Sequence, residues 1–299
     1  MRLLKPVPSF TGVGPNQQPV SNLAVGPTYD SFSLELYATT GGVTTLVPIA
    51  SLATHVGYIN VIADGVTIRR ITPALLIAYL SEKNLLQALT DSAGTAIKSA
   101  IIPFTDPTRP TVDGQEATAL GTVGIKQLLL QVELLAPAGY NYTLQGSSES
   151  RSAASAAKKF GFIETWTIES LALVNGTKDF NTISTTDDLL GLIVGSANVQ
   201  KVQVTADSNV LFQATIQDVI SARRQYRASV DVLSGTAPAM TGAFFPVTFD
   251  RSGQVTDLLP LAQRDATGKV TARVSDFVVT VTGTAAENVQ ALRRSLWRG

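Results

Sequence analysis

Apolar and polar residues alternate along much of the chain, and this period of two predicts β-strands. Over residues 29–37, phenylalanine and leucine side chains are separated by serine and glutamate. Residues 128–134 alternate in the same way. Two short apolar runs, 58–62 and 66–68, flank Asp64-Gly65, a dipeptide typical of a tight hairpin turn. The pattern therefore predicts antiparallel strands joined by short turns.

The second half of the chain continues this pattern. Strands are expected at 162–173 and 189–194, and residues 270–282 are interpreted as one long closing strand with a β-bulge near Ser275-Asp276. Residues 103–119 hold three prolines and an Asp-Gly pair, which predicts a long loop.

Helices are predicted between some of these strands. Thr72 as N-cap and Pro73 as first helical residue begin a helix that runs to about Leu89. Thr215 and Asp218 form a capping box that begins a second helix. Helices between strands would also fit parallel βαβ units, but the Asp-Gly hairpin and the strict alternation favour antiparallel pairing.

The chain repeats itself at a constant spacing. Ala63-Asp64 recurs 143 residues later as Ala206-Asp207, Thr72 recurs as Thr215 at the same offset, and a proline does so at 103 and 246. Gaps would be expected to shift the register between unrelated segments, so a constant offset across separate elements predicts an internal duplication.

Length and repeat together predict two β-domains in the 299 residues. The fold class is all-β with a few inserted helices, as two tandem jelly-roll β-sandwiches. The predicted parts are an N-terminal arm at 1–27 packed against a neighbour, a first jelly roll at 28–145, a flexible polar hinge at 146–161, a second jelly roll at 162–283 and a C-terminal amphipathic helix at 284–299.

Composition indicates surfaces that other molecules cover. Charged residues make up 15% of the chain, against about 25% in an ordinary soluble protein. Either the buried area is unusually large or the surface is buried against partners, and we favour the second explanation. The net charge is zero, so no overall field attracts nucleic acid. We expect a protein made in a cytoplasm, since the first residues lack the apolar core of a secretory signal.

Candidate chemistry is sparse, which predicts that the protein is not an enzyme. His55 is the only histidine and cysteine is absent, so a zinc site of these ligands and a cupin-type site are excluded by count. A structural or surface role is expected for His55. Paired carboxylates occur at Asp187-Asp188, interpreted as a solvated loop, and Glu133 is a further acid without a partner motif. Asp64 and Asp207 could bind calcium, but Asp is expected in such turns for backbone reasons alone.

The basic C-terminus is the one charge cluster. Arg293, Arg294 and Arg298 with Trp297 would lie on the predicted last helix, which begins with a Thr284-x-x-Glu287 capping box. Arginine and tryptophan on such a helix suit an anionic membrane surface or an acidic neighbour. The alternative is a helix packed on its own domain with its arginines in solvent.

Two segments resemble the major capsid proteins of corticoviruses, tailless icosahedral phages with an internal lipid membrane. They are Gly26-Pro27-Thr28-Tyr29-Asp30 with the strand Leu34-Glu35-Leu36-Tyr37, and Ala119-Leu120-Gly121-Thr122-Val123-Gly124. The resemblance implies a double jelly roll and homotrimers with a pseudo-hexagonal outline that tile a shell above the membrane. It also implies a pentameric vertex protein and the internal viral membrane as partners, and location in the virion capsid after assembly in the host cytoplasm. Calcium is associated with such shells, but no metal-binding residue carries over to this sequence.

The predicted function is thus that of a major capsid protein. The alternative is a carbohydrate-binding or carbohydrate-cleaving β-sandwich protein, such as a phage spike or tail component. Aromatic residues are only 7% and scattered, which weakens that alternative.

Overall fold

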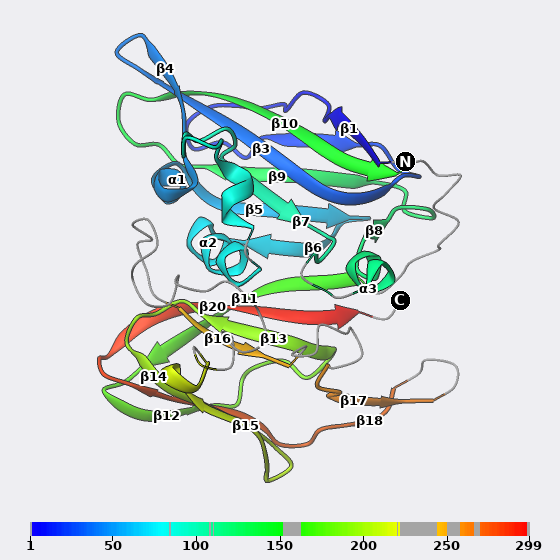
Figure 1. Cartoon of the computed structure of the whole chain (residues 1–299), viewed down its shortest axis with the longest axis vertical. Helices are drawn as coiled ribbons and strands as arrows, with labels where there is room; N and C mark the ends of the chain where they lie inside the picture. The colour runs from blue at the N-terminus through cyan, green and yellow to red at the C-terminus, as the bar shows by residue number, and fades with distance from the viewer. Residues whose placement is uncertain are drawn as a thin grey trace. The chain divides into compact units, whose positions relative to one another are not determined.

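The computed structural model describes residues 2–83, 85–107, 109, 111–151, 163–219, 221, 244–249, 258–265 and 270–297. Its contacts divide the chain into two compact units, Met1–Glu164 and Thr165–Arg298. Both units consist mainly of antiparallel strands (Figure 1). The all-β prediction with a few helices is confirmed.

The first unit holds two sheets. Its strands are β1 (Arg2–Pro6), β2 (Val20–Leu23), β3 (Thr28–Thr40), β4 (Val43–Leu46), β5 (Val56–Ala63), β6 (Val66–Ile71), β7 (Ala100–Pro103), β8 (Leu120–Gly121), β9 (Leu128–Leu134) and β10 (Asn141–Arg151). One sheet has the order β1-β10-β3-β4, with β7 and β8 also paired to β3, and the other contains β6-β5-β9-β2. The helices are η1 (Ile49–Ser51), α1 (Leu52–His55), α2 (Pro73–Glu82), η2 (Leu86–Leu89) and α3 (Val112–Glu116).

Strand β9 illustrates how the alternating pattern builds the core of this unit. Its residues alternate between buried and half-buried along all seven positions, with Leu128, Leu130, Val132 and Leu134 buried. Each such side chain contributes about 1.5–3 kcal/mol through removal from water. The predicted strand at 128–134 is confirmed.

The second unit is built in a similar way. Its strands are β11 (Ile163–Leu173), β12 (Gly176–Phe180), β13 (Asp188–Val194), β14 (Val199–Ala206), β15 (Asn209–Thr215), β16 (Phe245–Thr248), β17 (Ala262–Arg264), β18 (Val270–Arg273), β19 (Phe277–Gly283) and β20 (Glu287–Trp297). The sheet orders are β16-β13-β20-β11, β12-β19-β14-β15 and the pair β17-β18. A single apolar cluster joins the first two of these sheets, with Val202, Val204, Phe245, Val279 and Ala291 among its members.

The predicted duplication is confirmed at the level of one hairpin. Strands β5 and β14 begin at 56 and 199 and end at 63 and 206, so both bounds differ by 143. Asp64 and Asp207 follow them, both in the left-handed region with φ of 47°. This conformation is typical of a hairpin turn and is tolerated by aspartate.

The aspartate in each turn also holds the next strand in place. Asp64 Oδ1 accepts hydrogen bonds from the backbone N–H groups of 126–127, both at 2.8 Å, just before β9. Asp207 Oδ1 accepts from those of 275–276, at 3.0 and 3.1 Å, just before β19. The repeat therefore preserves a side chain that ties three strands together.

Two of the three predicted helix starts, at Thr72 and Thr215, follow the capping prediction. Thr72 Oγ1 accepts from Leu75 N at 3.5 Å and begins α2, which ends at Glu82 and is followed by η2. Thr215 N donates to Asp218 Oδ2 at 2.8 Å, while Asp218 N donates to Thr215 Oγ1 at 3.3 Å. The loop predicted at 103–119 contains the short helix α3.

The predicted flexible hinge at 146–161 is wrong over its first residues. Positions 146–151 belong to β10, which pairs with β1 on one side and β3 on the other. Glycine at position 146 allows the neighbouring segments to approach closely, since a Cβ there would lie 2.9 Å from Val7 Cγ2 and 3.0 Å from Ser33 O. Residues 152–162, including the predicted helix there, lie outside the described residues.

The predicted arm at 1–27 also forms part of its own unit. Strand β1 pairs with β10, and β2 pairs with β9. The polar and proline-rich composition concealed these edge strands because backbone pairing does not require an apolar pattern. Contact of this segment with a neighbouring molecule stays a prediction.

The predicted C-terminal helix at 284–299 is wrong, because residues 287–297 form strand β20. This strand pairs with β13 over most of its length, and such ladder bonds outweigh a weak local helix signal. Glu287 accepts a hydrogen bond from Asn198 Nδ2 at 3.0 Å instead of capping a helix.

The single long strand predicted at 270–282 is likewise wrong. It is split into β18 and β19, and the residues between them are those that donate to Asp207.

Candidate functional site

Two segments distant in sequence meet at one corner of the first unit. The start of β3 pairs with β8, with Thr28 opposite Gly121 and Tyr29 opposite Leu120. Thr122 Oγ1 donates to the carbonyl of Pro27 at 2.6 Å and accepts from Gly26 N at 2.7 Å. The two segments on which the capsid resemblance rests are therefore hydrogen-bonded neighbours.

A cluster of ion pairs lies beside this contact. Asp30 is 1% exposed and accepts two hydrogen bonds from the Arg151 guanidinium, at 2.7 and 3.1 Å. Arg151 also pairs with Glu116, and Arg2 of β1 lies 3.5 Å from Asp30 and 3.6 Å from Glu149. Burial alone would lower the pKa of Arg151, but the hydrogen bonds that its guanidinium donates to Asp30 and Glu116 outweigh this effect and raise the pKa. The cluster fastens β1, β3, α3 and the end of β10 to one another.

A second ion cluster fixes the loop at 103–119. Lys83 Nζ lies 2.5 Å from Asp106 Oδ2, and Arg109 Nε lies 3.5 Å from the same oxygen, with all three side chains buried. Arg109 also donates to the carbonyl of Gly114 at 3.0 Å. These pairs could not be predicted from the sequence, because they join residues of a long loop to the end of α2.

His55 has a structural role within the first unit, as predicted. Its Nδ1 lies 2.9 Å from the hydroxyl of Tyr142, and the rings of Tyr140 and Tyr142 lie edge-on to the imidazole. Burial lowers the pKa of His55.

The acidic turn residues do not fit a calcium site. Asp64 and Asp207 use Oδ1 to accept from two backbone N–H groups each, so a cation there would compete with those bonds. Among the described residues, no three acidic, histidine or cysteine side chains gather as metal ligands. The backbone hydrogen bonds of the two turns therefore account for both aspartates without a bound cation.

The adjacent acids Asp187 and Asp188 lie in different environments. Asp188 is buried in β13, so the solvated-loop interpretation is wrong for this residue. Asp187 is half-buried and its carbonyl accepts from Arg293 at 3.5 Å. Glu133 lies on β9, against Gly57 of β5.

The predicted C-terminal basic site is a strand with buried arginines. Arg293 is 4% exposed and Arg294 is 1% exposed. Burial lowers the pKa of Arg293, while Glu169 and Asp187 act in the opposite direction. The backbone of Trp297 ends β20, and Arg298 lies outside the described residues. A membrane-facing or neighbour-facing role for these four residues stays a prediction.

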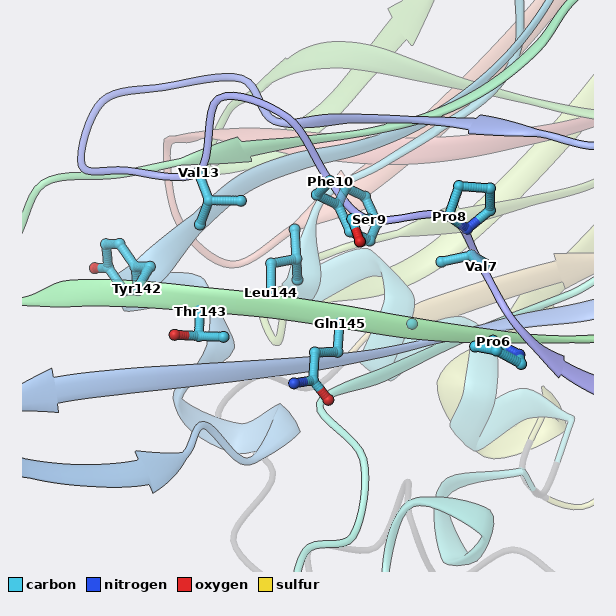
Figure 2. A pocket seen from close by; sticks show the side chains of 11 residues that line it. Pro6, Val7, Pro8, Ser9, Phe10, Val13, Tyr142, Thr143, Leu144 and Gln145 are labelled. Carbon is cyan, nitrogen blue, oxygen red and sulfur yellow. The ribbon is translucent and has the colours of Figure 1, made fainter.

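A hollow of about 470 Å³ lies between the N-terminal segment and β10. Figure 2 shows Phe10, Val13 and Leu144 on one side of the β10 ribbon, with Thr143 and Gln145 on the other. Val7 and Gly146, which both line the hollow, are joined by a hydrogen bond from Val7 N to Gly146 O. Its lining carries no charged side chain.

In the part of the chain that the structure describes, no helix is long and apolar enough to cross a bilayer.

Residues 4–151 match the protein family described as viral coat protein P2, N-terminal domain. The chain belongs to this family of viral coat proteins. It is therefore a structural component of a virion capsid and not an enzyme. No curated protein matches it.

Solved structures extend the likeness of this viral coat protein to its whole length. The major capsid protein P2 from bacteriophage PM2 is 16% identical, with a TM-score of 0.73 over 100% of this chain and 98% of that one. The STIV major capsid protein is 9% identical, with a TM-score of 0.64 and 99% and 96% coverage. A PBCV-1 virus capsid chain is 8% identical, with a TM-score of 0.63 and 99% and 93% coverage. The predicted double jelly roll is confirmed.

Proposed function

We propose that this coat protein forms homotrimeric capsomers of pseudo-hexagonal outline, which tile an icosahedral shell over an internal membrane. Two similar units per chain support this, because three chains then present six similar sandwiches around one threefold axis. A hexagonal outline allows such capsomers to pack side by side.

The distribution of charge supports extensive contact between copies. Among the described residues, ten charged side chains are buried inside the chain, which leaves the surface less charged than the composition implies. They are Asp30, Arg69, Glu82, Lys83, Asp106, Arg109, Glu164, Asp188, Arg293 and Arg294. A surface poor in charge is suited to burial against neighbours, since fewer ions lose their hydration.

The native mass of the purified protein tests the trimer. Light scattering should give a species of three times 31.5 kDa, or larger particles built from it. A monomer across a wide range of concentrations would contradict the proposal, because obligate contacts of roughly 2,000 Å² or more do not dissociate readily.

The proposed partners follow from the same assembly. A pentameric protein would close the vertices, and the inner surface of the shell would face the viral membrane after assembly in the host cytoplasm. Particles purified by density should contain phospholipid together with this chain and a second, less abundant shell protein. Lipid-free particles would argue against the membrane.

A further inference from the structure

Strand β15 leaves an unprotected edge on the second unit. It is the last strand in its sheet order and pairs only with β14 among the described residues. Its sequence, NVLFQAT, contains no charge and no proline, the usual devices against edge-to-edge pairing. Val210 is 55% exposed and Leu211 is 43% exposed. Such an edge is expected to be covered in a protein that assembles.

The internal repeat indicates which part of this edge should be covered. The register shifts by one residue at Ile68 in the β5–β6 pair and at Leu211 in the β14–β15 pair, so the same bulge recurs 143 residues apart. Ile68 is 5% exposed, whereas Leu211 is 43% exposed. The repeated hairpin therefore has one equivalent position that is buried in the first unit, as Ile68, and exposed in the second, as Leu211.

Strand β1 is a second open edge, on the first unit. It ends its sheet order, and Leu4 is 75% exposed. Val7 N donates to the carbonyl of Gly146, so odd-numbered residues of this segment direct their backbone groups toward β10. The N–H and C=O of Leu4 consequently point away from β10, free to pair with another strand.

We propose that β15 of one copy docks against β1 of a second copy, with Leu211 and Val210 packing near Leu4. This proposal rests on the proposed trimer and names the two strands that form its subunit contact. The two edges carry complementary charge, because Lys5 of β1 is exposed and the exposed Asp207 and Asp218 flank β15.

The choice of β1 over other edges follows from symmetry and charge. A contact between two different edges is heterologous and can close into a ring of three copies, whereas β15 against β15 is twofold and gives only pairs. Among the described strands, β4 is another edge with an exposed apolar residue, since Val43 is 63% exposed. That strand, VTTL, has no positive charge to meet Asp207 and Asp218.

Cysteine cross-linking tests the contact directly, because the natural chain has no cysteine. The full-length double variant Leu4→Cys with Leu211→Cys is treated with a short bismaleimide and resolved on a denaturing gel. Bands of two and three chains are expected. The matched control is Leu4→Cys with Val43→Cys, which places the second thiol on the β4 edge and should stay monomeric on the gel.

Single variants separate the alternatives. Neither Leu4→Cys nor Leu211→Cys alone should cross-link, whereas a mixture of the two during assembly should give covalent pairs. A trimeric mass without cross-links in the double variant would overturn this contact and leave the trimer intact. Efficient pairs from Leu211→Cys alone would replace it with a twofold β15 contact. A monomeric mass would overturn both proposals.

Discussion

His55 is buried against Tyr142, and burial lowers its pKa below the ordinary value of 6.5. The unfolded chain therefore binds this proton more tightly than the folded chain does. Its contribution to stability is fully present above about pH 6.5 and is lost as the pH falls through the folded-state pKa. The free energy of unfolding should drop between pH 7.5 and pH 5, as measured by chemical denaturation.

His55→Gln removes this titration and should flatten the pH dependence relative to the natural chain. Its stability at pH 7.5 should also be lower, because the bond to Tyr142 is disturbed. An unchanged slope in the variant would show that other groups account for the acid sensitivity.

The carboxylate of Asp30 is expected to contribute strongly to the stability of the fold. Asp30→Asn would leave the Arg151 guanidinium with a weakened partner at a largely buried position. We expect a loss of about 3–5 kcal/mol in the free energy of unfolding, the range for breaking a buried ion pair. Glu149→Gln is the matched control, since Glu149 is partly exposed and 3.6 Å from Arg2, and should cost about 0–1 kcal/mol. Equal effects of the two variants would contradict the assigned importance of Asp30.

At the scale of elements, the hairpin around Asp64 was the most predictable part of the chain. Its alternation and Asp-Gly turn are local properties, and the same local pattern allowed its copy at Asp207 to be recognised. The C-terminal strand β20 was not predictable in this way. A capping-box sequence and helical spacing favoured a helix, but the partner strand β13 lies about 100 residues away and decides the outcome.

Gly191 of β13 tests how tightly these strands are packed. A Cβ at this position would lie 2.7 Å from the carbonyl oxygen of Val247 in β16, and backbone atoms cannot move aside cheaply. Gly191→Ala should destabilise the chain by about 1–3 kcal/mol, measured by thermal or chemical unfolding.

Gly14→Ala serves as the control for that change. The added Cβ would meet only Gln17 Cγ at 3.5 Å, an ordinary contact. Comparable losses from the two substitutions would mean that loss of glycine itself, rather than the close approach of β16, determines stability.

At the scale of the whole molecule, assembly should depend on the β15 edge. Leu211→Lys places a charge on an exposed edge residue, so folding should be unaffected while docking of another strand is opposed. The expected result is a fall in native mass from trimer toward monomer while each chain stays folded, as judged by circular dichroism. Val43→Lys on β4 is the control and should remain trimeric. A trimeric Leu211→Lys protein would argue against the contact with β1.

Calcium removal is expected to leave a single chain unaffected. The described residues offer no cluster of acidic ligands, and the turn aspartates are engaged with backbone N–H groups. Addition of a chelator should therefore not shift the unfolding midpoint of the dissociated protein. A clear shift would reveal a metal site outside these residues.

The sequence alone determined most of the strand pattern, the repeat, the capped helix starts at Thr72 and Thr215 and the absence of catalytic motifs, because these depend on neighbours in the chain. It also supplied the two segments that resemble capsid proteins. Tertiary structure decided which polar segments became strands, as in β1, β10 and β20, since backbone pairing is indifferent to side-chain polarity. It also decided which charges are buried, because Asp30 meets Arg151 and Lys83 meets Asp106 only when distant strands and loops fold together.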